Sequence, residues 1–228
     1  MLKGKKEIRE RLLTMWPPMG DEKPTVVQRT IDYKDIPNKL RKNRQWVVWR
    51  NEKDDEGHDI VVYYHPTSGK EADPQYSPTW GSCRQAVRSY ERKGYDGIAY
   101  VFLPQDPIIG VFMNDCLNKN LPNRDAWRVI RLLRSYSEYF VDGRSMLVIV
   151  EGKLPEEEYY CDNMELINAG FCPISSRRFR PDLPRYYPKH TKKRQDGIDT
   201  LIKDFFRCAN EQAKAFSPPL RIKRRYEL

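Results

Sequence analysis

Histidine, paired cysteines and long apolar segments are scarce in this 228-residue chain, and each shortage excludes a class of protein. Only three histidines are present, and the five cysteines include no Cys-x-x-Cys pair, so a structural zinc site is not expected. The scattered, odd-numbered cysteines indicate reduced thiols in a cytoplasm rather than a secreted disulfide scaffold. No apolar stretch approaches the roughly 20 residues that cross a bilayer, and the N-terminus lacks the features of a secretory signal. We therefore expect a cytoplasmic protein without a membrane partner.

Positive charge is concentrated in one part of the chain. The net charge is +9, from 41 Lys and Arg against 32 Asp and Glu. Residues 175–228 hold 15 Lys and Arg against 6 Asp and Glu, which accounts for the whole excess, so residues 1–174 are neutral. This concentration indicates a polyanionic partner, and nucleic acid is the commonest one. The alternative is a solvated basic tail without a partner.

The hydrophobic pattern predicts an α+β fold with a largely antiparallel sheet flanked by helices. Two β-rich runs surround an acidic turn at 54–57, which is typical of a hairpin. The runs 97–102 and 108–113 are joined by a turn with two prolines, and we expect them to be adjacent antiparallel strands. Helical spacing is found at 82–93, after Asn123 and over 198–216, and further strands are expected at 147–150 and 164–167.

Composition divides the chain into three segments. Residues 1–35 read as a short basic helix and a connector, 36–180 as the main domain, and 181–228 as a basic extension with one amphipathic helix.

Within the main domain, short motifs follow one another in a specific order: IPNKL, QWVVW, HPTSGK, PTW and DGIAYVF, then IIGVFMNDC. This succession resembles the N-terminal domain of bifunctional DNA primase–polymerases of phages, plasmids and integrated elements, within the archaeo-eukaryotic primase superfamily. The resemblance implies a primase–polymerase-like fold that catalyses template-directed nucleotidyl transfer with divalent Mg or Mn. It also implies DNA and a nucleoside triphosphate as ligands, and a helicase or replication initiator as partner.

In that family, carboxylates from neighbouring strands hold two metal ions. The resemblance therefore predicts that residues 111–115, 147–150 and 164–167 lie side by side in one sheet. The first family motif is a strand ending in Gly-hydrophobic-Asp-hydrophobic-Asp-Asp-Cys, and its two ligand positions are here Phe112 and Asn114. The following acid is retained as Asp115, and Glu165 matches the acid of a later strand. By resemblance, Asp115 and Glu165 are the catalytic and metal-binding candidates. The alternatives are that no metal binds and that Glu165 is a solvated strand residue.

A second family motif, Ser-Gly-x-Gly-x-His, forms a loop against the triphosphate. The matching residues 142–147 keep Gly143, but Ser145 replaces the second glycine and Leu147 replaces the histidine. Arg144 is a candidate phosphate contact, because a guanidinium pairs well with phosphate oxygens. The resemblance therefore assigns nucleotide binding to Gly143, Arg144 and Ser145, against the alternative of an ordinary exposed loop arginine.

Two basic runs near the end of the main domain give the strongest direct signal for nucleic acid. They are separated by Tyr186 and Tyr187, and clustered charge with aromatic residues is typical of such interfaces. The predicted nucleic-acid-binding residues are Arg177, Arg178, Arg180, Lys192, Lys193 and Arg194.

Three functions remain open: a primase–polymerase with an altered metal set, a catalytically silent domain that binds nucleic acid, and a structural or protein-binding domain that keeps only the fold. The substitutions weigh against efficient catalysis, because loss of a single electrostatic group in an active site typically costs about 2.7–4 kcal/mol.

Overall fold

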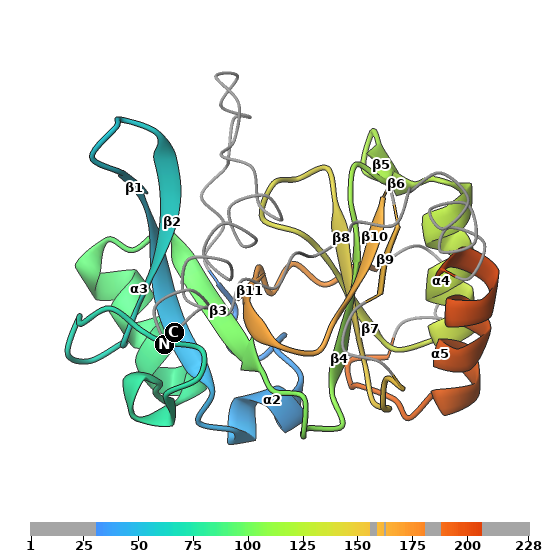
Figure 1. Ribbon diagram of the computed structural model, residues 1–228, viewed down its shortest axis with the longest axis horizontal. Helices are drawn as coiled ribbons and strands as arrows, with labels where there is room; N and C mark the ends of the chain where they lie inside the picture. Colours follow the sequence, from blue (N-terminus) through green and yellow to red (C-terminus); the bar gives the residue numbers. More distant parts are fainter. Residues whose placement is uncertain (1–30, 156–158, 162, 181–187, 207–228) are drawn as a thin grey trace, which may run out of the picture.

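The computed structural model describes residues 31–155, 159–161, 163–180 and 188–206 (Figure 1). The predicted N-terminal basic helix, the Tyr186–Tyr187 pair and the last part of the basic extension lie outside the described residues.

The described residues form an α+β fold, as predicted. Most strands belong to two antiparallel sheets, and β5 and β6 form a short separate hairpin. The elements in chain order are α2 (Asn38–Lys42), β1 (Trp46–Lys53), β2 (Asp59–Tyr64), η1 (Ser77–Thr79), α3 (Cys83–Lys93), β3 (Gly97–Phe102), β4 (Ile109–Met113), β5 (Leu117–Asn118), β6 (Leu121–Pro122), α4 (Arg124–Leu133), β7 (Tyr136–Tyr139), β8 (Met146–Val150), β9 (Tyr159–Cys161), β10 (Met164–Ile167), β11 (Gly170–Ile174), α5 (Gln195–Leu201) and the π-helical turn η3 (Ile202–Phe206).

The first sheet, sheet A, has the strand order β11-β3-β1-β2 and contains the predicted hairpin of β1 and β2. Its helix α3 begins at a capping box, in which Ser82 and Gln85 each bind the other's backbone amide. The helix ends at Gly94, whose φ of 65° is left-handed. The sequence prediction of a helix over 82–93 is therefore confirmed.

The second sheet, sheet B, has the order β7-β8-β4-β10-β9. The three strands that resemblance assigned to the family motifs, β4, β8 and β10, lie side by side at its centre, as predicted. Helices α4 and α5 cover the face of sheet B that is turned away from sheet A (Figure 1). We call this face outer and the opposite face inner.

The predicted pairing of 97–102 with 108–113 is wrong, because β3 belongs to sheet A and β4 to sheet B. The connection between them contains a tight turn, in which the Asp106 amide donates to the Leu103 carbonyl (2.9 Å), but this turn does not pair the two strands. The Gln45 side chain also holds the connection, by donating to the Val101 carbonyl (3.0 Å) and to the Asp106 carboxylate (2.6 Å). The chain thus leaves one sheet and enters the other.

A continuous hydrophobic core joins the inner face of sheet B to sheet A and to α2 and α3. Phe102 at the end of β3 packs so closely on Gly110 of β4 that a Cβ there would lie 3.3 Å from the ring. After β11 has paired with β3, the chain continues along β7, where the Tyr139 amide donates to the Arg177 carbonyl (2.9 Å) and the Phe179 amide donates to the Ser137 carbonyl (2.8 Å). We call residues 170–179 the crossover segment, because they contact both sheets.

The predicted C-terminal amphipathic helix begins at Gln195, earlier than expected, and its described part continues through η3. Ile198, Leu201 and Phe206 are buried against the outer face of sheet B. Among the described residues, no helix has both the length and the apolar character needed to cross a membrane.

Candidate functional site

The strand register aligns the predicted catalytic positions in one row across sheet B. Phe112 of β4 lies opposite Leu147 of β8 on one side and opposite Glu165 of β10 on the other. Directly paired residues of neighbouring strands point to the same face, about 5 Å apart. Leu147 in turn lies opposite Glu138 of β7. The structure thus brings Phe112, Leu147 and Glu165 together on the inner face and adds Glu138 to their row.

The centre of this row is apolar and filled. Phe112 and Leu147 are both buried in the core that joins the two sheets. The Phe112 ring packs edge-on against Phe140, with 5.1 Å between the ring centroids. Where the family places a carboxylate and a histidine, this chain places side chains that stabilise the packing and offer no ligand.

Asn114 and Asp115 follow the end of β4 and are exposed. The Asp115 backbone has a left-handed φ of 43°, which turns its side chain out of the strand alternation. Its carboxylate forms an ion pair with Arg144 of the β7–β8 loop, with 3.4 Å between Oδ1 and Nε. Both residues keep contact with that loop, since the Asp115 amide donates to Ser145 Oγ (3.2 Å) and Asn114 Oδ1 lies 3.2 Å from the same hydroxyl.

The β7–β8 loop is closed by its own carboxylate. Oδ1 of Asp142 accepts hydrogen bonds from the amides of Arg144 and Ser145, each 2.9 Å long, and Oδ2 accepts one from the Ser145 hydroxyl (2.6 Å). Gly143 adopts a left-handed φ of 73°, and its amide donates to the Phe140 carbonyl (3.2 Å). The amides that such a loop would present to a phosphate are therefore bound within the chain, and only the exposed Arg144 guanidinium faces solvent.

The carboxylates near this row are not arranged to bind a pair of divalent ions. Asp115 is engaged by Arg144, and apolar side chains separate Glu138 from Glu165 in the row. Across the described part of the chain, no three His, Cys, Asp or Glu side chains lie close enough together to hold a metal. Magnesium and manganese prefer several oxygen ligands, which this arrangement does not supply.

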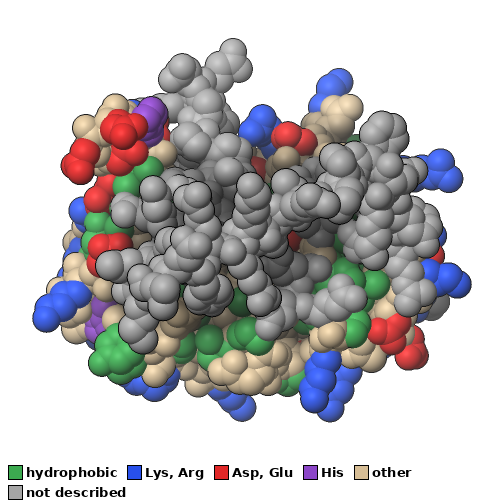
Figure 2. Space-filling view, viewed as in Figure 1, with side chains coloured by type: hydrophobic (Ala, Val, Ile, Leu, Met, Phe, Trp, Pro, Cys, Tyr) green, Lys and Arg blue, Asp and Glu red, His purple; other side chains and the backbone are tan. Residues whose placement is uncertain are grey.

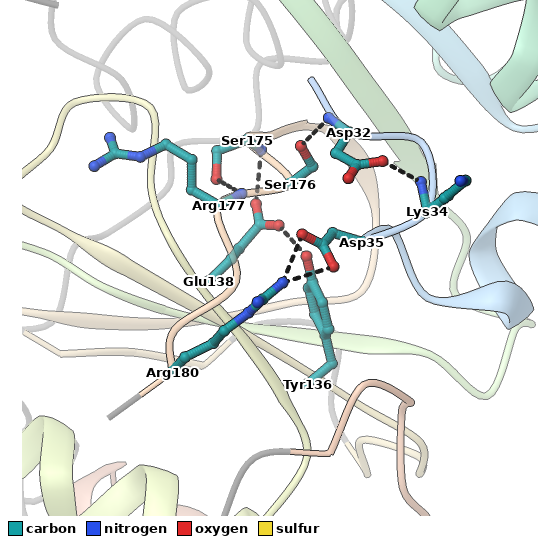
Figure 3. Close-up of polar contacts among 9 residues, drawn as sticks. All are labelled: Asp32, Lys34, Asp35, Tyr136, Glu138, Ser175, Ser176, Arg177 and Arg180. Atoms are coloured by element: carbon teal, nitrogen blue, oxygen red, sulfur yellow. Dashed lines mark hydrogen bonds and ion pairs between the residues drawn. The ribbon is translucent and has the colours of Figure 1, made fainter. Parts of the chain in front are cut away.

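Sequence reasoning missed Glu138, the most deeply buried carboxylate of the site. It accepts a hydrogen bond from the Tyr136 hydroxyl (2.7 Å) and one from the Ser175 amide (2.8 Å), as Figure 3 shows. Burial raises the pKa of Glu138 to about 7, and these hydrogen bonds lower it only in part. The sequence Tyr136-Ser137-Glu138-Tyr139 places one tyrosine and one polar residue on each face, so it lacks an apolar alternation and does not indicate a buried strand.

Glu138 lies where the N-terminal described residues, β7 and the crossover segment meet. The Asp32 amide donates to the Ser176 hydroxyl (2.9 Å), and the Arg180 guanidinium contacts both oxygens of Asp35 (2.9 and 3.0 Å), as seen in Figure 3. Ser176 has a left-handed φ of 55°, so the chain turns sharply beside the carboxylate. The N-terminal described residues, β7 and the crossover segment are thereby held together.

The two predicted basic runs meet on one edge of sheet B. The first run follows β7 through its bonds to Ser137 and Tyr139, and the second is attached where the Lys192 amide donates to the Ser135 hydroxyl (2.9 Å). The first run lies along β7, and the second lies beside the start of β7, where its backbone also pairs with Glu151 after β8. Eleven residues of chain separate Arg180 from Lys192. We call this region the β7 edge.

The side chains of these runs differ in how firmly they are held. Lys192 and Lys193 are exposed, whereas Arg194 donates to the Leu133 carbonyl (3.0 Å) and Arg180 is paired with Asp35. Arg177 and Arg178 are half-buried, and among the described residues neither Nε atom has a hydrogen-bond acceptor. The lysines are thus the groups most freely available to a polyanion.

Comparison with known proteins supports the resemblance. No family model matches the chain. A DNA primase-polymerase of Nitratiruptor phage NrS-1 is 29% identical over 119 residues, which is 51% of this chain and 16% of the phage protein. Over about half of its length, this chain is therefore similar to a DNA primase-polymerase. The match spans only a small part of the phage protein.

Proposed function

We propose that the chain is the DNA-binding, primase–polymerase-like domain of a mobile-element replication protein in the cytoplasm, and that its nucleotidyl transfer is weak or lost. The register of β8, β4 and β10 carries the proposal. It sets the three family motifs side by side and, at the same time, puts Phe112 and Leu147 where the family's chemistry needs charged or polar groups.

Weak catalysis follows from charge. Nucleotidyl transfer gathers negative charge on a triphosphate, and each missing electrostatic group costs about 2.7–4 kcal/mol of transition-state stabilisation. Asp115 and Glu165 are the acids left for the reaction, and Asp115 is bound to Arg144. Arg144 remains the residue best placed to contact a nucleoside triphosphate, because its side chain is exposed beside the closed loop.

DNA binding is supported by the β7 edge. Lys192 and Lys193 lie beside the start of β7, and the half-buried guanidinium groups of Arg177 and Arg178 lie along it, so their positive charge is concentrated in space as well as in sequence. Lysine and arginine bind DNA through its phosphates, independently of base sequence.

The phage relative is much longer than the stretch that matches this chain. A helicase or replication-initiator partner belongs to the proposal at the level of a larger replication protein, and it rests on the family resemblance.

Binding and synthesis are tested separately. We expect the chain to bind fluorescent single-stranded DNA, with affinity falling steeply as salt rises. Lys192→Glu/Lys193→Glu should weaken binding about tenfold or more, since two phosphate contacts become repulsive. Lys70→Glu/Arg92→Glu is the matched control, because it makes the same charge change at exposed positions beside sheet A.

Nucleotidyl transfer is tested by primer extension with manganese, which compares the unmodified chain with Asp115→Asn/Glu165→Gln. We expect little synthesis from either protein. Robust synthesis that the double variant abolishes would overturn the proposal and make Asp115 and Glu165 metal ligands. Failure to bind DNA at low salt would favour the structural or protein-binding alternative.

A further inference from the structure

Four arginines line the exposed side of helix α4, on the outer face of sheet B. Arg124, Arg128 and Arg131 are spaced four and three residues apart, which places them on one stripe of a helix. Arg134 follows at the C-cap, and all four are exposed. Figure 1 shows α4 on the side of the molecule away from sheet A, and Lys and Arg side chains project along that margin in Figure 2. Asp125 is the acid of the first turn.

A series of ring contacts links this helix to the crossover segment. Arg131 lies over the Trp127 ring, 5.3 Å from its centroid, and Trp127 packs edge-on against Phe179, with 5.6 Å between centroids. Phe179 packs in the same way against Tyr139 (5.4 Å), and Arg177 lies over the Tyr139 ring (5.5 Å). Trp127 and Tyr139 are half-buried, so part of each ring reaches the surface between the arginines.

The arginines differ in whether they form ion pairs within the protein. Arg128 forms an ion pair with Asp204 (2.6 Å) and lies over the Phe205 ring (5.2 Å), so it holds η3 to α4. For Arg124, Arg131 and Arg177, by contrast, no carboxylate of the described residues lies within ion-pair distance. Their charge is available to a ligand.

We infer that Arg124, Arg131, Arg177, Trp127 and Tyr139, which we call the outer arginine track, form a second binding surface for single-stranded DNA. This inference rests on the proposed DNA-binding function. Guanidinium groups pair with phosphates, and the accessible parts of half-buried aromatic rings can contact unpaired bases. A duplex keeps its bases stacked internally and would gain only the charge contacts.

The outer arginine track is continuous with the β7 edge. Arg177 belongs to the crossover segment that runs along β7, and Arg194 of the second basic run donates to the Leu133 carbonyl at the end of α4. A single strand bound along the β7 edge can therefore continue onto α4 without leaving positively charged surface. The track lies on the face of sheet B opposite the Phe112 row, and it receives DNA beside the ancestral catalytic face rather than in it.

The test compares short and long single strands, of about 8 and about 30 nucleotides, since a single binding module covers roughly 4–16 nucleotides. We expect Arg124→Ala/Arg131→Ala to weaken binding of the long strand about three- to tenfold and to lower its salt slope by about 1.4, from two lost phosphate contacts. Binding of the short strand should stay unchanged. Lys70→Ala/Arg92→Ala is the charge-matched control, and a photo-crosslinking residue in place of Arg131 should label the long strand.

Each other outcome has a distinct meaning. If the unmodified chain binds DNA but Arg124→Ala/Arg131→Ala binds the long strand equally well, the outer arginine track is wrong and the proposed function stands. If the variant loses affinity for duplex as much as for the single strand, the single-strand assignment is wrong. If the unmodified chain binds neither length, the proposed function fails and the track fails with it.

Discussion

The two faces of sheet B differ in what they pack against and in where charged side chains lie at their borders. The inner face, where Phe112 and Leu147 stand at the family's ligand positions, is packed into the core with sheet A. The outer face packs too, through Val111 and Val148 beneath α4, but it is bordered by exposed arginines and half-buried aromatic rings. At the positions where the resemblance places ligands, Phe112 and Leu147 are packed in the core and stabilise the fold, and the exposed charge lies at the borders of the sheet.

The largest expected effect comes from restoring a carboxylate on the inner face. Phe112→Asp removes a ring packed against Phe140 and places a carboxylate in the core, so the free energy of unfolding should fall by about 3–5 kcal/mol. Urea denaturation followed by fluorescence measures it. Asn114→Asp restores the other ligand position at an exposed site and should change stability by no more than about 0.5 kcal/mol.

A Phe112→Asp protein as stable as the parent would show that the inner face is open, and it would end the contrast between the two faces. The same reasoning predicts that reinstating the family motif does not restore synthesis unless the core is redesigned around it.

The next effect is a pH dependence from Glu138 on the inner face. The folded chain holds the Glu138 proton up to about pH 7, because burial raises its pKa, whereas the ordinary value for a glutamate is 4.5. Between these values the folded state binds more protons than the unfolded state, so stability is greatest at the acidic end and falls as pH rises toward 7. The loss is about 3 kcal/mol over this window.

Glu138→Gln should remove this slope, since the amide does not titrate and the Tyr136 hydroxyl can turn to accept from it. Urea midpoints measured at several pH values give the comparison, and Glu165→Gln is the control because Glu165 is only half-buried. Arg178, Asp35 and Arg180 also face this region, and their charges are the same in both proteins. If stability still falls with pH in the same way in Glu138→Gln, the pH dependence comes from another group.

A smaller effect on stability is expected in the β7–β8 loop, which Asp142 holds by hydrogen bonds within the loop. Asp142→Ala removes the acceptor of two amides and one hydroxyl in a partly exposed loop, so stability should fall by about 1–2 kcal/mol. Asp142→Asn keeps an oxygen acceptor and should lose less. If the carboxylate occupies the place of a phosphate, tripolyphosphate should raise the melting temperature of Asp142→Ala and leave that of the parent unchanged. Equal responses in both proteins would contradict this interpretation.

The smallest effect belongs to the ion pair of Arg180 and Asp35. It is partly exposed, so a double-mutant cycle with alanine at both positions should give a coupling energy of about 0.2–1 kcal/mol. A coupling well above that range would indicate that the N-terminal described residues depend on this pair for their attachment to the β7 edge.

The central strands could be predicted from the sequence because each is a short apolar run that follows a recognisable turn. The register of β4, β8 and β10 was accessible only through the family resemblance, since periodicity does not reveal which strands pair. The predicted pairing of β3 with β4 failed for that reason: short antiparallel connections normally pair neighbours, and here the chain changes sheets.

β7 and Glu138 were missed because of their composition. A strand with a serine and a glutamate reads as a solvated segment unless the partners of the carboxylate are known, and one of those partners, Ser175, lies 37 residues away. The meeting of the two basic runs on the β7 edge was likewise inaccessible, because it depends on hydrogen bonds to β7 that no local pattern encodes.

The crossover segment makes the two sheets a single cooperative unit. An opening motion that separates them would have to break the β3–β11 ladder or the bonds that join Tyr139 and Phe179 to their partners. Amide hydrogens in sheet A and in sheet B should therefore exchange with solvent only when both sheets unfold together, rather than one sheet at a time. With the two sheets joined in this way, the described part of the chain would meet a nucleic acid as a rigid body, and any adjustment would come from the DNA strand.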